Sequence, residues 1–293
     1  MKTLEYLSDP ALRSIFLPGV IAGLAIALFG GMLSVFVVMK RMAFIGQGIS
    51  HAAFGGIGVA YVLGFGGAVS AGAFGAQLGI VFLFCLFAAL QIGFLTGGDP
   101  GRRGRRAQAD TAIGIVLVAS MALGSLLLHL AEKMQRSSTV SWESLLFGSI
   151  VSVGEADAWA CVAIAGLILV TLFLLRRPMT FWAFDESAAA AFGVNTRLMR
   201  FVLLVLLALA TVTAMKLAGV VLATAMLVLP AAAAVQFGSD AKRVCILSVV
   251  FALVAVMLGV VLSFELDWPT GASIVLVLAV IFALGRIKGL GSR

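Results

Sequence analysis

Long apolar segments alternate with short charged or glycine-rich connections along the whole chain. Each apolar segment is close to the ~20 residues that a helix needs to cross roughly 30 Å of hydrocarbon. The pattern predicts an all-α integral membrane protein, a polytopic bundle of about nine transmembrane helices that forms a single domain over residues 1–293. The expected spans are residues 15–39, 44–64, 78–96, 111–131, 156–175, 199–215, 219–236, 244–263 and 271–286.

The sixth and seventh predicted spans are separated only by the short connection from Met215 to Gly219. An arrangement of about eight helices is therefore the alternative. Pro230 lies inside the seventh span and predicts a kink or a break, since proline cannot donate a backbone hydrogen bond and clashes with the preceding turn. A hinge at this proline is a hypothesis.

Basic residues divide unequally between the two predicted sides of the membrane. With the N-terminus outside and the C-terminus inside (N-out/C-in), fifteen of the 20 lysines and arginines fall on the inner side. Cytoplasmic loops of membrane proteins carry such an excess, so the bias predicts this orientation. It also explains the net charge of +7 without a nucleic-acid partner.

The chemistry that the sequence lacks narrows the function. No carboxylate lies deep in a predicted span, which disfavours proton- or sodium-coupled transport. No GxxxxGK[ST], HExxH or GxSxG motif occurs, so the chain is not expected to be an enzyme or to hydrolyse ATP by itself. Cys85, Cys161 and Cys245 fall in predicted spans and are interpreted as buried thiols rather than disulfide partners. Energy for pumping would have to come from a partner.

The cytoplasmic segment 181–195 is the natural contact point for such a partner. Pro178 is expected to end the preceding helix, Asp185 and Glu186 have the character of an acidic first turn, and Gly193 would end the short helix that follows. Three aromatic residues just before it are expected to be exposed: Phe181, Trp182 and Phe184. The segment is either a docking surface or an interfacial helix resting on lipid headgroups.

Five stretches carry a resemblance to a known family, and they follow one another in that family's order over most of residues 15–285. They are RMAFIGQGISHAAFGGIGVAYVLG from Arg41, DTAIGIVLVASMALGSLLL from Asp110, LLFGSIVSV from Leu145, FDESAAAAFGV from Phe184 and MKLAGVVLATAMLVLPAAAA from Met215. Together these resemble the permease subunits of bacterial zinc, manganese and iron importers of the ATP-binding-cassette (ABC) class.

The resemblance implies a permease in the bacterial cytoplasmic (inner) membrane, surrounded by lipid and paired with a second copy as a homodimer. It also implies two cytoplasmic ABC ATPase subunits and an extracytoplasmic metal-binding protein that delivers zinc, manganese or iron. No permanently bound cofactor is expected, because the metal is the cargo. The segment 181–195 becomes the coupling helix that contacts the ATPase, through Phe184, Asp185, Glu186, Ala188 and Gly193.

The resemblance places the metal-passage site at Gln47 and His51, where the family most often has an aspartate instead of Gln47. On a helix these two residues share one face, with Ser50 beside them. Neutral imidazole is a good ligand for these metals, whereas an amide oxygen is weaker and uncharged. Small residues at every fourth position from Ala52 let another helix approach closely. The alternative is that both polar side chains only hydrogen-bond across helices.

Three further features are expected to be subsidiary. His129 is interpreted as an interfacial residue near the outer end of the fourth span. Glu265 and Asp267, on an outer loop, would meet basic residues of a binding protein or simply be solvated. Asp110 is expected to be the N-cap of its helix.

The function expected from these features is ATP-driven import of a divalent metal by alternating access. An importer of another substrate, such as a metal chelate, is the similar alternative. A non-transporting membrane scaffold that docks a soluble partner is the alternative from a different class.

Overall fold

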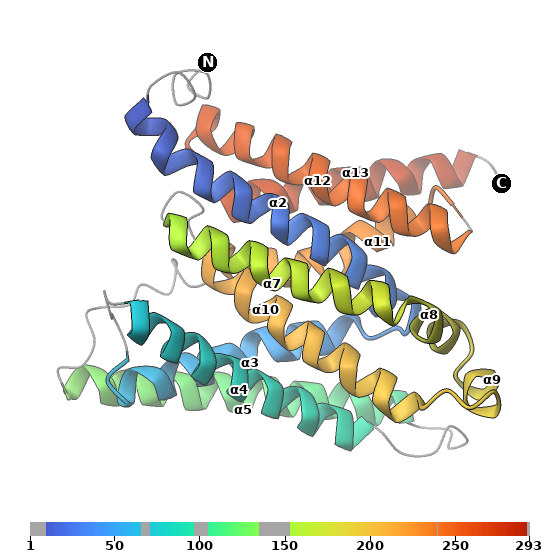
Figure 1. Cartoon of the computed structure of the whole chain (residues 1–293), viewed down its shortest axis with the longest axis horizontal. Helices are drawn as coiled ribbons and strands as arrows, with labels where there is room; N and C mark the ends of the chain where they lie inside the picture. Colours follow the sequence, from blue (N-terminus) through green and yellow to red (C-terminus); the bar gives the residue numbers. More distant parts are fainter. Residues whose placement is uncertain (1–9, 66–70, 97–104, 135–152, 239, 292–293) are drawn as a thin grey trace. The chain divides into compact units, whose positions relative to one another are not determined.

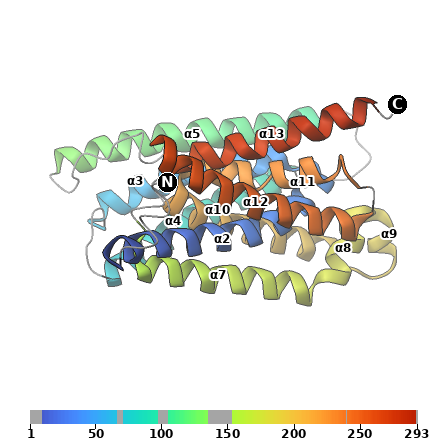
Figure 2. The same ribbon diagram turned by 90° about the horizontal axis from the view of Figure 1, so that it is seen from above.

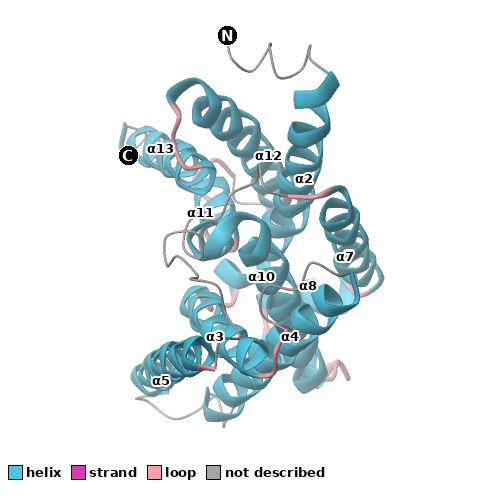
Figure 3. Cartoon of the chain, turned by 90° about the vertical axis from the view of Figure 1, so that its left-hand side faces the viewer, coloured by secondary structure: helices cyan, strands magenta, loops and turns pink. Residues whose placement is uncertain are grey.

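A computed structural model describes residues 10–65, 71–96, 105–134, 153–238 and 240–291. All regular structure in this part of the chain is helical (Figure 3). The elements are α2 (Pro10–Met39), α3 (Ala43–Val62), α4 (Ala71–Thr96), α5 (Arg105–Lys133), α7 (Glu155–Leu174), α8 (Arg176–Phe184), α9 (Glu186–Ala191), α10 (Thr196–Met226), α11 (Leu229–Ala234), α12 (Ala241–Leu266) and α13 (Thr270–Gly291).

Seven of these helices are long and apolar enough to cross a membrane, and each coincides with a predicted span. They are α2, α4, α5, α7, α12, α13 and the Thr196–Met215 part of α10. The all-helical membrane fold is therefore confirmed. The other two predicted spans are α3, which is 20 residues long but less apolar, and the shorter stretch Ala218–Ala234. The number of spans and the N-out/C-in orientation stay predictions.

The chain divides into two compact units. Unit 1 comprises Met1–Ala43, Trp142–Val194 and Thr213–Arg293, and unit 2 comprises Phe44–Ser141 and Asn195–Val212. The helix α10 runs from unit 2 into unit 1, so the two units are joined within one helix as well as by loops.

In unit 1, α2 lies against α7, α11 and α12, and α12 also packs on α13 (Figure 1). A buried polar contact joins α2 to α12, because Ser34 Oγ and Ser248 Oγ both donate to the Gly31 carbonyl, at 2.8 and 2.7 Å. Satisfying polar groups inside the helix pair in this way makes their burial tolerable in a hydrocarbon environment. This contact fixes the register of α2 on α12.

The break predicted around Pro230 is present. Gly219 has a left-handed backbone (φ 82°) that kinks α10, and α10 ends at Met226. Pro230 then lies in the first turn of the separate short helix α11, where a proline costs no backbone hydrogen bond. The predicted span 219–236 is thus two short helical pieces rather than one continuous helix.

In unit 2, α3 packs closely on α4 and α5. A Cβ added at Gly124 of α5 would lie 2.6 Å from the backbone of Phe54, and one at Gly56 would lie 2.9 Å from Val81 Cα of α4. The thiol of Cys85 also contacts the Ile49 carbonyl at 3.5 Å. Glycine and small residues therefore let these three helices meet nearly backbone to backbone, as the small-residue row of α3 predicted.

One sequence prediction about a helix end was wrong, because the fourth predicted span begins earlier, at Arg105, so Asp110 lies inside α5 and is not its N-cap. The helix before Pro178 does end, as predicted, at Leu174. A new helix, α8, then starts at Arg176 with the proline in its first turn. Proline is tolerated in that turn because its missing N–H has no intrahelical partner there. The apolar piece 145–153 lies almost wholly outside the described residues.

Candidate functional site

Gln47 and His51 lie four residues apart on α3, so they share one face of this helix. Gln47 is exposed and His51 is half-buried, one turn further along the helix. The residues between and behind them, including Gly48, Ile49 and Ser50, are buried. The helical spacing predicted from sequence therefore places the imidazole and the amide on one accessible stripe.

The His51 ring contacts a neighbouring aromatic ring of the same helix. Its plane stacks on the buried ring of Phe54, with centroids 6.0 Å apart and an interplanar angle of 21°. Its Nδ1 atom is buried and has no hydrogen-bond partner among the described residues. A buried polar atom without a partner costs about 1–3 kcal/mol, so a group that supplies one would be bound favourably.

Ser50 does not join this pair. Its side chain is buried and its hydroxyl donates to the Gln47 carbonyl at 3.0 Å, so its hydrogen-bonding capacity is used within α3. No cluster of three or more histidine, cysteine, aspartate or glutamate side chains that could hold a metal ion occurs in the described part of the chain. One chain thus offers one imidazole and one amide to a cation at this place, which is too few ligands for a closed site.

The second candidate site is the short helix α9 in unit 1. Its N-cap Asp185 accepts a hydrogen bond at Oδ1 from the Ala188 N–H at 2.9 Å. At its C-terminus Gly193 has φ +83°, and the N–H groups of Gly193 and Val194 donate to the carbonyls of Ala190 and Ala189. This is a Schellman motif, which only glycine enters without strain. The helix predicted in segment 181–195 is present and is closed at both ends.

Figures 1 and 2 show α8 and α9 together beyond the C-terminal end of α7. Phe184 and Phe192 are 62% and 80% exposed, and Phe192 contacts the Phe181 ring at 5.8 Å. The prediction that Trp182 is also exposed was wrong, since it is 1% exposed. The periodicity of α8 explains this, because Met179, Trp182 and Ala183 form its buried face while Phe181 and Phe184 fall on the other side.

Sequence reasoning missed Lys40, the residue that joins α2 to this segment. Its ammonium lies 3.0 Å from Glu186 Oε2 and 4.1 Å from the centroid of the Trp182 ring. The sequence signal was a lysine just after an apolar helix, which by itself indicates only membrane orientation. Its partners are more than 140 positions away, so only the fold brings them together.

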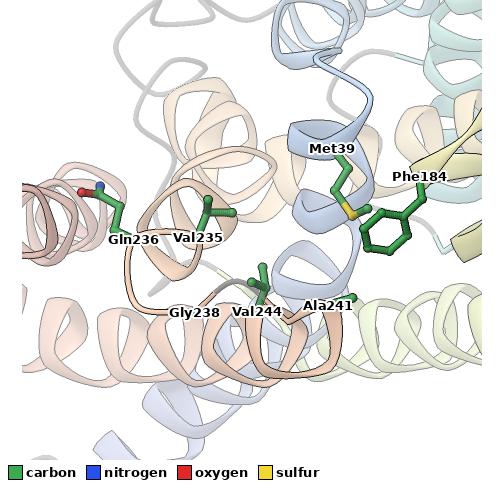
Figure 4. A pocket seen from close by; sticks show the side chains of 7 residues that line it. All are labelled: Met39, Phe184, Val235, Gln236, Gly238, Ala241 and Val244. Atoms are coloured by element: carbon green, nitrogen blue, oxygen red, sulfur yellow. The ribbon is translucent and has the colours of Figure 1, made fainter. Parts of the chain in front are cut away.

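A pocket of about 450 Å³ opens where the end of α2, the end of α8 and the start of α12 meet (Figure 4). It is lined by Met39, Phe184, Val235, Gln236, Gly238, Ala241 and Val244. The lining is apolar apart from one amide, so the pocket offers no acid, base or nucleophile and no set of metal ligands. It adds an exposed apolar surface beside α9.

Of the subsidiary residues, Glu265 was expected on a loop but lies half-buried in the last turn of α12. His129 is exposed near the end of α5, 3.9 Å from Glu132. Asp267 has a left-handed backbone (φ 55°) in the tight connection between α12 and α13, which Ser263 ties to Thr270 at 3.0 Å. Trp268 is 48% exposed on that connection.

Seven helices long and apolar enough to cross a membrane, in the part of the chain that the structure describes, are the architecture of a multi-pass membrane protein. Comparison with known proteins agrees: the model of the ABC 3 transport family matches residues 13–289. The chain belongs to this family, as its sequence resemblance predicted, and is a multi-pass protein of the bacterial cytoplasmic membrane.

Curated and solved relatives extend the comparison. The chain is 31% identical over 262 residues to the manganese transport system membrane protein MntC of Listeria innocua, covering 89% of this chain and 86% of that protein. It is 27% identical to a probable iron transport system membrane protein of Haemophilus influenzae, with 96% of each chain covered. The solved structure of PsaBC from Streptococcus pneumoniae in complex with Fab is similar with a TM-score of 0.77 and 27% identity, covering 96% of this chain and 93% of that one.

Proposed function

We propose that this chain is the permease subunit of an ATP-driven importer of a divalent metal, manganese or iron(II). The observation that carries the proposal is the similarity over nearly the whole chain to transport proteins named for these two metals. The capped helix α9 and the polar stripe of α3 supply two features that such a subunit needs.

In this proposal Gln47 and His51 contact the metal as it passes. The unpartnered Nδ1 atom of His51 is the main support, because a metal or a further ligand shell would satisfy it. One imidazole and one amide are too few for a stable site, so a second copy of the chain would bring its own pair to the same place. A site of two imidazoles and two amides binds a dication more weakly than a site in which carboxylates replace the amides. Weaker binding suits a site that must also release its ion.

ATP hydrolysis takes place in separate cytoplasmic subunits, since the sequence holds no phosphate-binding loop. The exposed surface of α9, with Phe184 and Ala188 beside its capping residues Asp185, Glu186 and Gly193, is the proposed contact for these subunits. A helix whose ends are closed by its own side chains moves as a rigid body, so displacement by a closing ATPase would be passed on to unit 1 rather than absorbed locally.

A metal-binding protein outside the cell would deliver the ion. The connection between α12 and α13 is the described part of the chain best suited to meet it, because Asp267 and Trp268 are exposed on a tight turn. Basic residues on the delivering protein would complement this acidic and aromatic turn.

The deciding experiment is uptake of radioactive manganese into proteoliposomes that contain the purified complex, with ATP on the ATPase side and competing iron(II), zinc or a metal chelate. Uptake that needs ATP and is blocked by iron(II) supports the proposal. Competition by zinc alone would reassign the substrate, and competition by a chelate alone would favour the chelate importer. An ATPase that hydrolyses ATP at the same rate with and without this chain and metal would favour the scaffold.

A further inference from the structure

Lys40 is an unusual residue for its position. It directly follows the last residue of α2, yet only 12% of its side chain is exposed. A buried ammonium is costly unless it is paired and hydrogen-bonded. Here the Glu186 carboxylate lies 3.0 Å away and the face of the Trp182 ring lies 4.1 Å from the nitrogen, so the charge is held from two sides.

The two partners of Lys40 belong to neighbouring short helices. Trp182 is on the buried face of α8, and its Nε1 has no hydrogen-bond partner among the described residues. The ring therefore serves as an apolar and π-electron platform rather than as a hydrogen-bond donor. Glu186 is the first residue of α9 and is partly exposed, at 36%. A single lysine thus fastens the end of α2 to both short helices.

α2 is in turn fastened to the rest of unit 1 by a buried polar contact with α12. Six residues before Lys40, Ser34 shares the Gly31 carbonyl with Ser248 of α12, and all three contacts are buried. α2 also packs along α7 and α11. Movement of the end of α2 is therefore passed to the centre of unit 1, and the contact of Lys40 with Glu186 connects α9 directly to that end of α2.

We propose that Lys40 is a positioning residue for transport, which couples α9 to α2 through Glu186 and Trp182. This inference rests on the proposed function, in which α9 receives the motion of an ATPase. A charge-assisted bond on an aromatic platform transmits displacement in both directions, while a loop alone would transmit little. The lysine touches no metal and no nucleotide in this scheme, so its removal affects the yield of transport per ATP rather than hydrolysis itself.

The test compares variants in the reconstituted complex, with metal uptake and ATP hydrolysis measured in the same vesicles. Lys40→Met keeps the aliphatic stem and removes the charge, and Glu186→Gln removes the partner. Each should lower the metal transported per ATP by about fivefold or more, the size of an ordinary coupling free energy, and the double variant should be no worse than either single variant. Lys40→Arg should retain at least half of the wild-type ratio, because arginine keeps both the charge and the ring contact.

The matched control is Lys242→Met, which removes the same charge from an exposed position in the first turn of α12. It should leave the ratio unchanged. An unchanged ratio in Lys40→Met overturns the inference, as does a loss of equal size in Lys242→Met, or a loss explained by failure of the ATPase to co-purify. Should Lys40→Met fail to fold, the ratio in Glu186→Gln decides by itself. Wild-type vesicles that show no ATP-dependent uptake would instead refute the proposed function, so the two failures are distinguishable.

Discussion

The stripe of α3 and the region around α9 handle polar groups in opposite ways. At α3, His51 has a buried nitrogen without a partner in the described structure, and Gln47 faces outward. At α9, the N-cap, the C-terminal glycine turn and the Lys40–Glu186 pair satisfy backbone and charged groups that would otherwise be unpaired, and the one neighbouring atom without a partner in the described structure is Trp182 Nε1. The difference suits the two proposed tasks, since a site that must bind and release a substrate needs a ligand atom that is free to bond, whereas a part that transmits force needs its charged groups and helix ends held.

The largest effect is expected from His51→Ala, which removes the imidazole from the stripe. Manganese uptake should fall by about tenfold or more, because the loss of one good metal contact is worth at least ~1.4 kcal/mol. Uptake of radioactive manganese by whole cells measures this. Ser50→Ala, which removes a hydroxyl bonded only within α3, is the control and should transport nearly normally. Undiminished uptake in His51→Ala would remove His51 from the pathway.

The packed side of α3 is expected to tolerate change far less than its stripe. Gly124→Ala would place a methyl group 2.6 Å from the Phe54 backbone, an overpacking that costs about 1–3 kcal/mol. Thermal unfolding of the purified protein in detergent should show a lower midpoint. Gly114→Ala in the same helix has no atom within 4 Å of the added carbon and should leave the midpoint unchanged or raise it, because alanine favours a helix more than glycine does. Equal midpoints for the two variants would mean that α3 and α5 are not packed this closely.

A smaller effect is expected at the end of α9. Gly193→Ala places a side chain at φ +83° and should cost about 1 kcal/mol, which frays the Schellman turn. Co-purification of the ATPase should weaken by about fivefold, as judged by the salt concentration and dilution that separate the subunits. Gly166→Ala, in an open position of α7, is the matched control. If the Gly193→Ala variant binds the ATPase as tightly as the wild-type chain does, α9 does not contact the ATPase.

The smallest effect is expected from Gln47→Asp. An added carboxylate should bind a dication more tightly and release it more slowly, so both KM and the maximal rate of uptake should fall, by about threefold each. Gln47→Asn, which keeps the amide, is the control and should change KM and the maximal rate of uptake little. An unchanged KM together with an unchanged maximal rate in Gln47→Asp would show that the side chain at this position does not meet the metal.

Residues close together in the sequence were enough to predict most of the helices. Apolar runs located the seven long helices, and the acidic turn and Gly193 located α9, because capping depends on residues a few positions apart. The register of His51 and Gln47 on one stripe followed from helical spacing alone.

Long-range contacts and buried faces could not be predicted in this way. Trp182 was expected to be exposed because aromatic residues near a membrane surface often are, yet α8 turns it inward onto Lys40. The contact between Lys40 and Glu186 joins distant parts of the sequence and has no local signal. Asp110 failed as an N-cap because the residues before it can also continue a helix.

The glycines of α3 have a consequence for how the protein is made. Five of its 20 residues are glycine, each of which lowers intrinsic helix stability by about 1 kcal/mol relative to alanine. By itself α3 should therefore be a weak helix. During biosynthesis it should become stable only when α4 and α5 are present to cover its backbone.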